Sequence, residues 1–310
     1  MTFLFWLVPL VIIVILAVIG AYIFYTACSR RKEYNWADPA SLKNTPYAKH
    51  IDLINHSSQW LASHNPTDIY VNSEDGLKLH GYWIPAENPR GTILLAHGYR
   101  STMLVDFGMV LDMYHKQGMN LLLPEQRSHG KSEGKYITFG VKESKDMFRW
   151  LDYHNQNLST CPVVLSGLSM GASTVMYMLD QPLPSNVKAA ICDCGFSSPA
   201  AIISKIFKET VHIPAAPFIR IADLFAHLIA GFSFYEKNSR VTLSKNHLPI
   251  LMAHGKADDF VPCSMTEEAF ACCTGEKYLI LAEDAEHGYS FLRAREAYQS
   301  TVLKILNDNL

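Results

Sequence analysis

The chain has 310 residues, of which 49% are hydrophobic and 18% charged, and its formal net charge is −2. These values exclude a disordered chain, a collagen-like repeat and a strongly basic nucleic-acid-binding protein. The average conceals an uneven distribution, because 24 of the first 28 residues are apolar and none of them is charged. We therefore expect an apolar anchor (residues 1–28), a linker that leads in (29–66) and a soluble domain (67–310) large enough for a sizeable core.

The first predicted element is a membrane-spanning helix. Residues 3–25 are 23 nearly uninterrupted apolar residues, and about 20 helical residues cross the hydrocarbon of a bilayer. A cleaved signal peptide and a buried core helix are the alternatives, but no Lys or Arg precedes the run, and it has no polar face. Arg30, Arg31 and Lys32 follow it. They predict a single-pass protein of the cell membrane with an outward N-terminus and a cytoplasmic domain.

A helix and a β-hairpin are predicted next. The helix covers about residues 46–63, where the linker ends. Two alternating apolar runs, 68–72 and 77–84, flank Ser-Glu-Asp-Gly at 73–76. Asp-Gly between two such runs is a hairpin signal.

The rest of the chain has the pattern of an α/β domain. Short apolar runs alternate with helix-length segments of mixed polarity, and such runs are typical of strands that are covered on both faces. The runs are 92–96, 119–123, 162–165, 189–192, 250–253 and 278–281. We therefore expect an α/β fold with a mainly parallel sheet and the hairpin at one edge.

A helical insertion interrupts this alternation at residues 195–248. These 54 residues separate two predicted strands, far more than one crossover needs. Helices are expected at about 198–210 and 217–230. The second is apolar on most of its circumference, with Arg220, Asp223 and His227 as polar interruptions. A lid over an apolar pocket, a membrane-facing cap and ordinary packing onto the domain all fit this pattern.

The most informative motif is Gly-Leu-Ser-Met-Gly at 167–171, between a predicted strand and a helix-compatible segment. This arrangement is typical of a nucleophile elbow, in which the glycines leave room for a tight turn. A serine hydroxyl also needs a base, and the base needs an orienting acid. Asp258 and Asp259 follow one strand, and His287 follows the last. We predict Ser169 as nucleophile, His287 as general base and acid, and one of the two aspartates as its partner.

Over about residues 68–305, these features resemble the α/β-hydrolase superfamily, specifically the serine hydrolases grouped with monoglyceride lipases and S33-type aminopeptidases. His-Gly-Tyr at 97–99 is similar to the family's oxyanion loop, which implies that the backbone N–H groups of Tyr99 and Met170 stabilise the oxyanion. The segment 254–262 is similar to the family's acid loop. That similarity selects Asp258 over Asp259.

One loop departs from the family pattern. Residues 124–132 resemble the superfamily's Asp-x-Arg-Gly-His-Gly-x-Ser loop, but Glu125 stands for the Asp and Ser128 for the Gly. The loop is structural in the relatives, so these departures concern its packing rather than catalysis.

The resemblance implies hydrolysis of a carboxylic ester or thioester through an acyl-enzyme, with no cofactor and no metal. The apolar insertion and the anchor favour a lipophilic acyl substrate of small-molecule size, with the lipid bilayer contacted through residues 3–25 and no nucleic acid as a partner. Two alternatives stay open. One is an S33-like aminopeptidase or amidase, for which Asp223 is the obvious carboxylate to bind a free amine. The other is a membrane-tethered binding protein without turnover.

Overall fold

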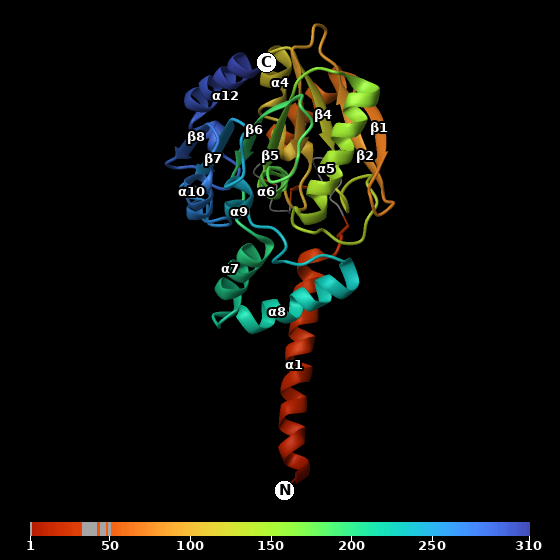
Figure 1. Ribbon diagram of the computed structural model, residues 1–310, viewed down its shortest axis with the longest axis vertical. Helices are drawn as coiled ribbons and strands as arrows, with labels where there is room; N and C mark the ends of the chain where they lie inside the picture. Colours follow the sequence, from red (N-terminus) through yellow and green to blue (C-terminus); the bar gives the residue numbers. More distant parts are fainter. Residues whose placement is uncertain (1, 33–41, 44–47, 49–50) are drawn as a thin grey trace.

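The computed structural model describes residues 2–32, 42–43, 48 and 51–310 of the chain (Figure 1). The predicted helix at 46–63 is observed as α2 (Ile51–Ser63), and residues 46, 47, 49 and 50 lie outside the described residues. Much of the predicted linker lies outside them as well. The division of the chain at residues 28 and 66 stays a prediction.

An eight-stranded sheet forms the centre of the domain, with the strand order β1-β2-β4-β3-β5-β6-β7-β8. β2 pairs antiparallel with both β1 and β4, and every other pair is parallel. All eight predicted runs form strands, and the hairpin lies at one edge, so the predicted fold is confirmed. The strands are β1 (Thr67–Asn72), β2 (Lys78–Ile84), β3 (Gly91–Ala96), β4 (Met119–Pro124), β5 (Val163–Leu168), β6 (Val187–Asp193), β7 (Ile250–Gly255) and β8 (Lys277–Ala282).

Helices cover both faces of this sheet, which explains why its central strands are apolar on both sides. Along β5, Val163 and Leu165 face one core and Val164 faces the other, as the two-residue period of a strand requires. The first core is completed by α5 (Val141–Tyr153), α6 (Met170–Met178), α9 (Ser239–Leu243) and α10 (Cys263–Cys272). The second is completed by α2, α3 (Met103–Phe107), α4 (Leu111–Lys116), α11 (Ser290–Arg293) and α12 (Arg295–Asn309).

The insertion between β6 and β7 forms a helical cap at one end of the domain (Figure 1). Its helices are α7 (Pro199–Val211) and α8 (Ala216–Phe225), and a π-helical turn, η4 (Ala226–Ala230), extends α8. They coincide with the two helices predicted there. The Ser198 Oγ accepts a hydrogen bond from the Ala201 N–H and caps α7, because the first N–H groups of a helix have no partner within it.

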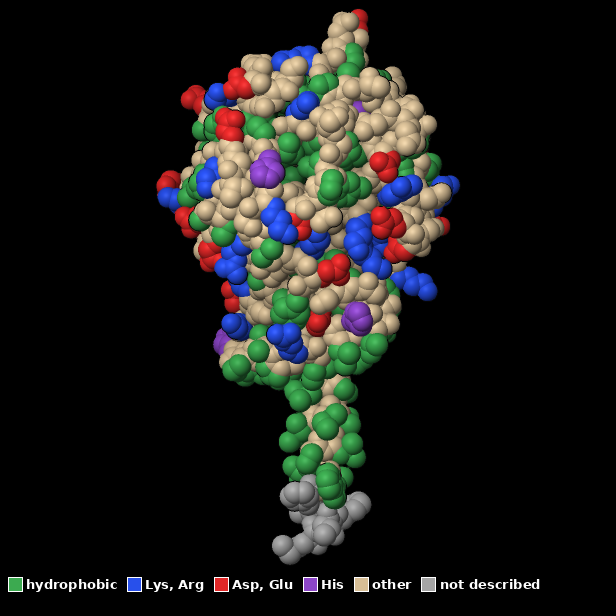
Figure 2. All heavy atoms as spheres, in the orientation of Figure 1, with side chains coloured by type: hydrophobic (Ala, Val, Ile, Leu, Met, Phe, Trp, Pro, Cys, Tyr) green, Lys and Arg blue, Asp and Glu red, His purple; other side chains and the backbone are tan. Residues whose placement is uncertain are grey.

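The N-terminal helix α1 (Thr2–Cys28) leaves the domain beside this cap and projects away from it (Figures 1 and 2). Within the described residues, it is long and apolar enough to cross a membrane over Trp6–Cys28. Its outer part is exposed, whereas Phe24 and Cys28 near its C-terminal end are fully buried. Figure 2 shows apolar side chains along the projecting part and on the end of the domain around it.

Candidate active site

The three residues predicted to act together lie at the carboxyl end of the parallel strands. Ser169 follows β5, Asp258 follows β7 and His287 follows β8. The carboxyl ends of parallel strands share one edge of a sheet, and this edge is where α/β proteins place their ligands. The sheet therefore brings together side chains that are up to 118 positions apart in the sequence.

Ser169 occupies a strained turn between β5 and α6. Its backbone has φ 56° and ψ −118°, a conformation that is rare for a residue with a side chain. The two glycines of the motif are required by space. A Cβ at Gly167 would lie 2.2 Å from the Gly171 carbonyl oxygen, and a Cβ at Gly171 would lie 1.7 Å from the Ala96 carbonyl oxygen.

A continuous chain of hydrogen bonds joins the three side chains. The His287 Nε2 lies 2.9 Å from the Ser169 Oγ, and the His287 Nδ1 lies 2.6 Å from the Asp258 Oδ2. If Nδ1 donates to the carboxylate, Nε2 is the acceptor that can take the serine proton. The Asp258 side chain is fully buried, whereas that of His287 is 26% exposed.

Three further donors, besides His287, hold Asp258 as a carboxylate. Its Oδ1 accepts the backbone N–H groups of Phe260 and Val261 at 2.9 and 2.8 Å, and the His254 Nε2 lies 3.1 Å from its Oδ2. Burial raises the pKa of this carboxyl, but the hydrogen bonds from His254 and His287 lower it by more than burial raises it. The pKa therefore lies well below its ordinary value. Asp259 points to solvent instead. The structure thus places Asp258, and not Asp259, against His287.

The loop after β3 presents one unused N–H group beside Ser169. A Cβ at Gly98 would lie 3.3 Å from the Ser169 Cβ, so this loop borders the serine. The Gly98 N–H donates to the Asp106 Oδ2 at 2.5 Å, and the Arg100 N–H donates to the His129 Nε2 at 2.9 Å. Among the described residues, the Tyr99 N–H between them has no hydrogen-bond partner.

Met170 supplies the second unused N–H group. It is the first residue of α6, where a backbone N–H finds no acceptor within the helix. No acceptor for it occurs elsewhere in the described part of the chain. Two backbone donors are therefore available at the serine, as an oxyanion hole requires.

His254, Asp106 and His129 position the site, and the sequence did not reveal their roles. The ring of His97 also contributes, because its Nδ1 lies 2.9 Å from the Gly98 oxygen and its Nε2 accepts the Gln126 N–H at 3.0 Å. The sequence held one signal for two of these residues, because His254 lies in the acid-loop segment 254–262 and His129 lies in the loop 124–132.

Acid is expected to destabilise the protein through His129. Burial and the neighbouring His97 lower the pKa of His129 to about 3, whereas an unfolded histidine titrates near pH ~6.5. Between these values the unfolded chain binds a proton that the folded chain does not. The stabilisation from this group is therefore complete above pH ~6.5 and is lost as pH falls toward 3, by up to about 1.4 kcal/mol per pH unit.

The measurement is urea unfolding of the full chain in detergent at pH 7, 6, 5 and 4. His129→Gln keeps an acceptor for the Arg100 N–H and cannot titrate in this range, so its free energy of unfolding should depend less on pH. The exposed His247 gives the control His247→Gln, which should follow the wild type. An unchanged slope in His129→Gln would contradict the assignment.

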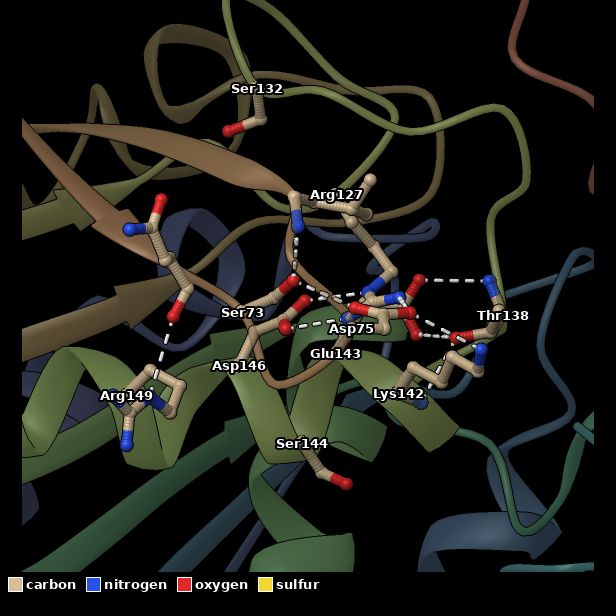
Figure 3. A network of polar contacts seen from close by, with 12 residues as sticks. Ser73, Asp75, Arg127, Ser132, Thr138, Lys142, Glu143, Ser144, Asp146 and Arg149 are labelled. Carbon is tan, nitrogen blue, oxygen red and sulfur yellow. Dashed lines mark hydrogen bonds and ion pairs between the residues drawn. The ribbon is translucent and has the colours of Figure 1, made fainter. Parts of the chain in front are cut away.

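The loop at 124–132 is anchored by Arg127, which lies between two carboxylates (Figure 3). Its Nε and Nη2 each donate to Asp146 of α5 at 2.6 Å, and its Nη1 donates to Asp75 of the hairpin turn at 2.9 Å. The two departures from the family pattern differ in how they fit. Glu125 is accommodated, because its Oε2 accepts the Lys131 N–H at 2.6 Å, whereas Ser128 adopts φ 65°, which glycine tolerates better.

Removing the Arg127 guanidinium is expected to cost stability. Arg127→Met leaves the Asp146 carboxylate, which is 5% exposed, buried without its cation, and such a change typically lowers the free energy of unfolding by about 3–5 kcal/mol. Arg149 pairs with Asp152 at the surface, with both side chains nearly half exposed. Arg149→Met should therefore cost less than about 1 kcal/mol. Equal losses in the two variants, measured by urea unfolding, would contradict this interpretation.

Two cavities meet at Ser169. The first, of about 520 Å³, lies between α1, the cap and the serine, and apolar side chains such as Phe196, Ile203 and Phe207 line it. The second, of about 480 Å³, extends past His287 and contains more polar groups, including Ser101 and Asp106. Both volumes lie within the usual range of small-molecule sites.

One set of side chains here could hold a metal ion by geometry. Ligand atoms of Cys194, Asp258 and His287 lie within 4.8 Å of one another. Metals bind the thiolate, and burial raises the pKa of the Cys194 thiol well above its ordinary value. The His287 Nδ1 is also hydrogen-bonded to Asp258. The donor set therefore fits a hydrogen-bonded triad better than a metal centre.

Asp223, the candidate amine-binding residue, is used inside the cap. Its carboxylate accepts the Ser233 hydroxyl at 2.9 Å and the Phe234 N–H at 2.6 Å. It lines neither of the two cavities at Ser169.

Comparisons with known proteins agree with this fold. Residues 87–246 match the sequence model of a family described as serine aminopeptidase, S33. The chain is 27% identical to YqkD of Bacillus subtilis over 243 residues, which are 78% of this chain and 79% of YqkD. It is similar in structure to the esterase Pf2001 of Pyrococcus furiosus, with a TM-score of 0.65 and 23% identity over 80% of this chain and 92% of the esterase. It also resembles the acylaminoacyl peptidase of Pyrococcus horikoshii, with a TM-score of 0.58 and 17% identity over 79% of this chain and 41% of the peptidase.

Proposed function

Because the chain belongs to the serine aminopeptidase S33 family and has the α/β-hydrolase fold, we propose that Ser169, His287 and Asp258 are its catalytic triad. The observation that carries this proposal is the unbroken hydrogen-bond chain from the Ser169 Oγ through His287 to Asp258. A serine hydrolase needs an activated nucleophile, and these hydrogen bonds give Ser169 the base that activates it.

The geometry supports a two-step acyl transfer to water. The Ser169 Oγ attacks the acyl carbon as the His287 Nε2 takes its proton, and the Tyr99 and Met170 N–H groups stabilise the oxyanion. His287 then returns the proton to the departing alcohol, and the acyl group stays on Ser169. Water then attacks the acyl-enzyme as His287 takes its proton, and His287 returns that proton to the Ser169 Oγ as the carboxylic acid leaves. Asp258 stabilises the imidazole whenever it carries the extra proton.

We propose a lipophilic carboxylic ester as the substrate. The first cavity reaches Ser169 and is lined mostly by apolar side chains, so it suits an acyl chain better than a charged amine. The second cavity, with its polar groups, suits the departing alcohol. The name of the Pyrococcus furiosus esterase, which shares the fold, is consistent with ester chemistry. The aminopeptidase alternative is weaker because Asp223 does not face the site.

A chain-length series tests this proposal. Each buried methylene contributes about 0.8 kcal/mol, or about fourfold in kcat/KM, so p-nitrophenyl octanoate should be cleaved at least about tenfold more efficiently than the butyrate. Aminoacyl arylamides should be cleaved far more slowly than either ester. Turnover of arylamides alone would rule out the lipophilic-ester proposal.

We also propose that α1 anchors the protein in the cell membrane with the catalytic domain on the cytoplasmic side. The exposed apolar surface of α1 supports the anchor, and Arg30, Arg31 and Lys32 at its inner end support the orientation. Protease added outside sealed cells should then leave the domain intact. Digestion of the domain from outside would reverse the proposed orientation.

A further inference from the structure

The C-terminal part of α1 forms one wall of the apolar cavity at Ser169. Ile19, Tyr22 and Ile23 line this cavity, and Ile203 and Phe207 of α7 line it as well. Ser169 lines the same cavity, and a helix that only tethered the domain would not need to line it. α1 therefore contributes to the space in which the acyl chain is proposed to lie.

The packing of α1 fixes the position of this wall. Gly20 lies so close to α8 that a Cβ there would be 2.5 Å from the Ile221 Cγ2. At the inner end of α1, the Cys28 carbonyl oxygen accepts the Ile137 N–H at 2.7 Å, and the Arg30 N–H donates to the Lys135 oxygen at 2.8 Å. The helix is thus held both by the cap and by the main domain.

The same end of α1 is tied to the candidate oxyanion loop. The Tyr99 hydroxyl donates to the Ala27 oxygen at 2.6 Å, and the Arg100 Nη2 donates to the Thr26 oxygen at 2.8 Å. The last carbonyl groups of a helix lack partners within it and favour a nearby cation. The residue that offers the unused N–H therefore also caps α1, and the two elements are positioned together.

We propose that Ile19, Tyr22 and Ile23 of α1, which line the cavity, are a specificity-determining part of the active site, and that they select long acyl chains drawn from the bilayer that α1 enters. This inference rests on the proposed ester hydrolase function. The cap carries exposed apolar side chains, among them Ile206, Val211 and Leu228. It lies at the end of the domain from which α1 projects (Figure 1). Ile206 and Val211 also line the cavity, so the exposed apolar surface of the cap continues into it and suits a substrate that resides in lipid.

Substitutions at Ile19 in the full chain test the proposal. Ile19→Trp should narrow the cavity and lower the ratio of kcat/KM for a dodecanoyl ester to that for a butanoyl ester at least about tenfold. Ile19→Ala should shift the preference toward longer chains. Val18 is the neighbouring residue, is 63% exposed and does not line the cavity. Val18→Trp should therefore leave the ratio within about twofold of the wild type.

Labelling by a small fluorophosphonate separates the possible failures. If the wild type and all variants are labelled but Ile19→Trp and Ile19→Ala keep the wild-type ratio, α1 does not set selectivity and this inference is wrong. If the wild type neither labels nor cleaves esters, the proposed function fails, and the inference fails with it. If Ile19→Trp alone is not labelled because it does not fold, the ratio in Ile19→Ala decides the question.

Discussion

Ser169→Ala is expected to lower kcat for ester hydrolysis by about 10⁶-fold, because removing the nucleophile of such a triad eliminates the acyl-enzyme route. Apolar contacts in the cavity persist in this variant, so a non-cleavable long-chain ester analogue should bind with a Kd close to that of the wild type. Steady-state kinetics and fluorescence titration in detergent measure the two quantities.

The exposed Ser244 provides the control. Ser244→Ala also removes one hydroxyl, but Ser244 precedes β7 and so does not belong to the carboxyl ends of the strands. Its kcat should stay within about twofold of the wild type. If Ser169→Ala lost less than about tenfold in kcat, another group would have to be the nucleophile.

Asp258→Asn is expected to lower kcat by about 10⁴-fold. An amide that donates to the His287 Nδ1 would favour the tautomer whose Nε2 carries the proton, and that nitrogen could not accept from Ser169. The change also removes the charge that stabilises the protonated imidazole. Steady-state kinetics on one ester at one pH give kcat and kcat/KM for each variant, and both should fall.

Asp259→Asn is a matched control one position away. The Asp259 side chain faces solvent, so its conversion to the amide should change kcat/KM by less than about twofold. Equal losses in the two variants, or a larger loss in Asp259→Asn, would contradict the placement of Asp258 against His287.

The sheet and the order of the candidate catalytic residues could be predicted because their causes are local. A strand covered on both faces must be apolar along its whole length, so Val163, Val164 and Leu165 indicate a central strand without knowledge of its neighbours. The elbow is local in part, since Gly167 is required by the backbone of Gly171 four positions later, whereas Gly171 is required by the Ala96 carbonyl oxygen in the adjacent strand β3.

The support around the site could not be predicted because it depends on contacts between distant segments. The bond between the Arg100 N–H and His129 spans 29 positions and that between Tyr99 and Ala27 spans 72. Neither has a signature in sequence spacing. Asp223 shows the same limit, because its carboxylate turns to Ser233 and Phe234 in a loop of the cap.

The dual use of α1 was hidden for a different reason. An apolar side chain such as that of Ile19 is equally favourable in a bilayer and in the wall of an apolar cavity, so composition cannot distinguish the two environments. The structure separates them, since Trp6 and Val18 are more than 60% exposed while Ile23 is 8% exposed and lines the cavity.

Covalent labelling with a fluorophosphonate, followed by intact-mass analysis and peptide mapping, tests the central claim most directly. Such probes react with a serine that an adjacent base activates, and a binding protein without turnover lacks that activation. We expect one adduct per chain, located on Ser169 and absent from Ser169→Ala. A folded wild-type protein that stays unlabelled, or an adduct that persists in Ser169→Ala, would contradict the account.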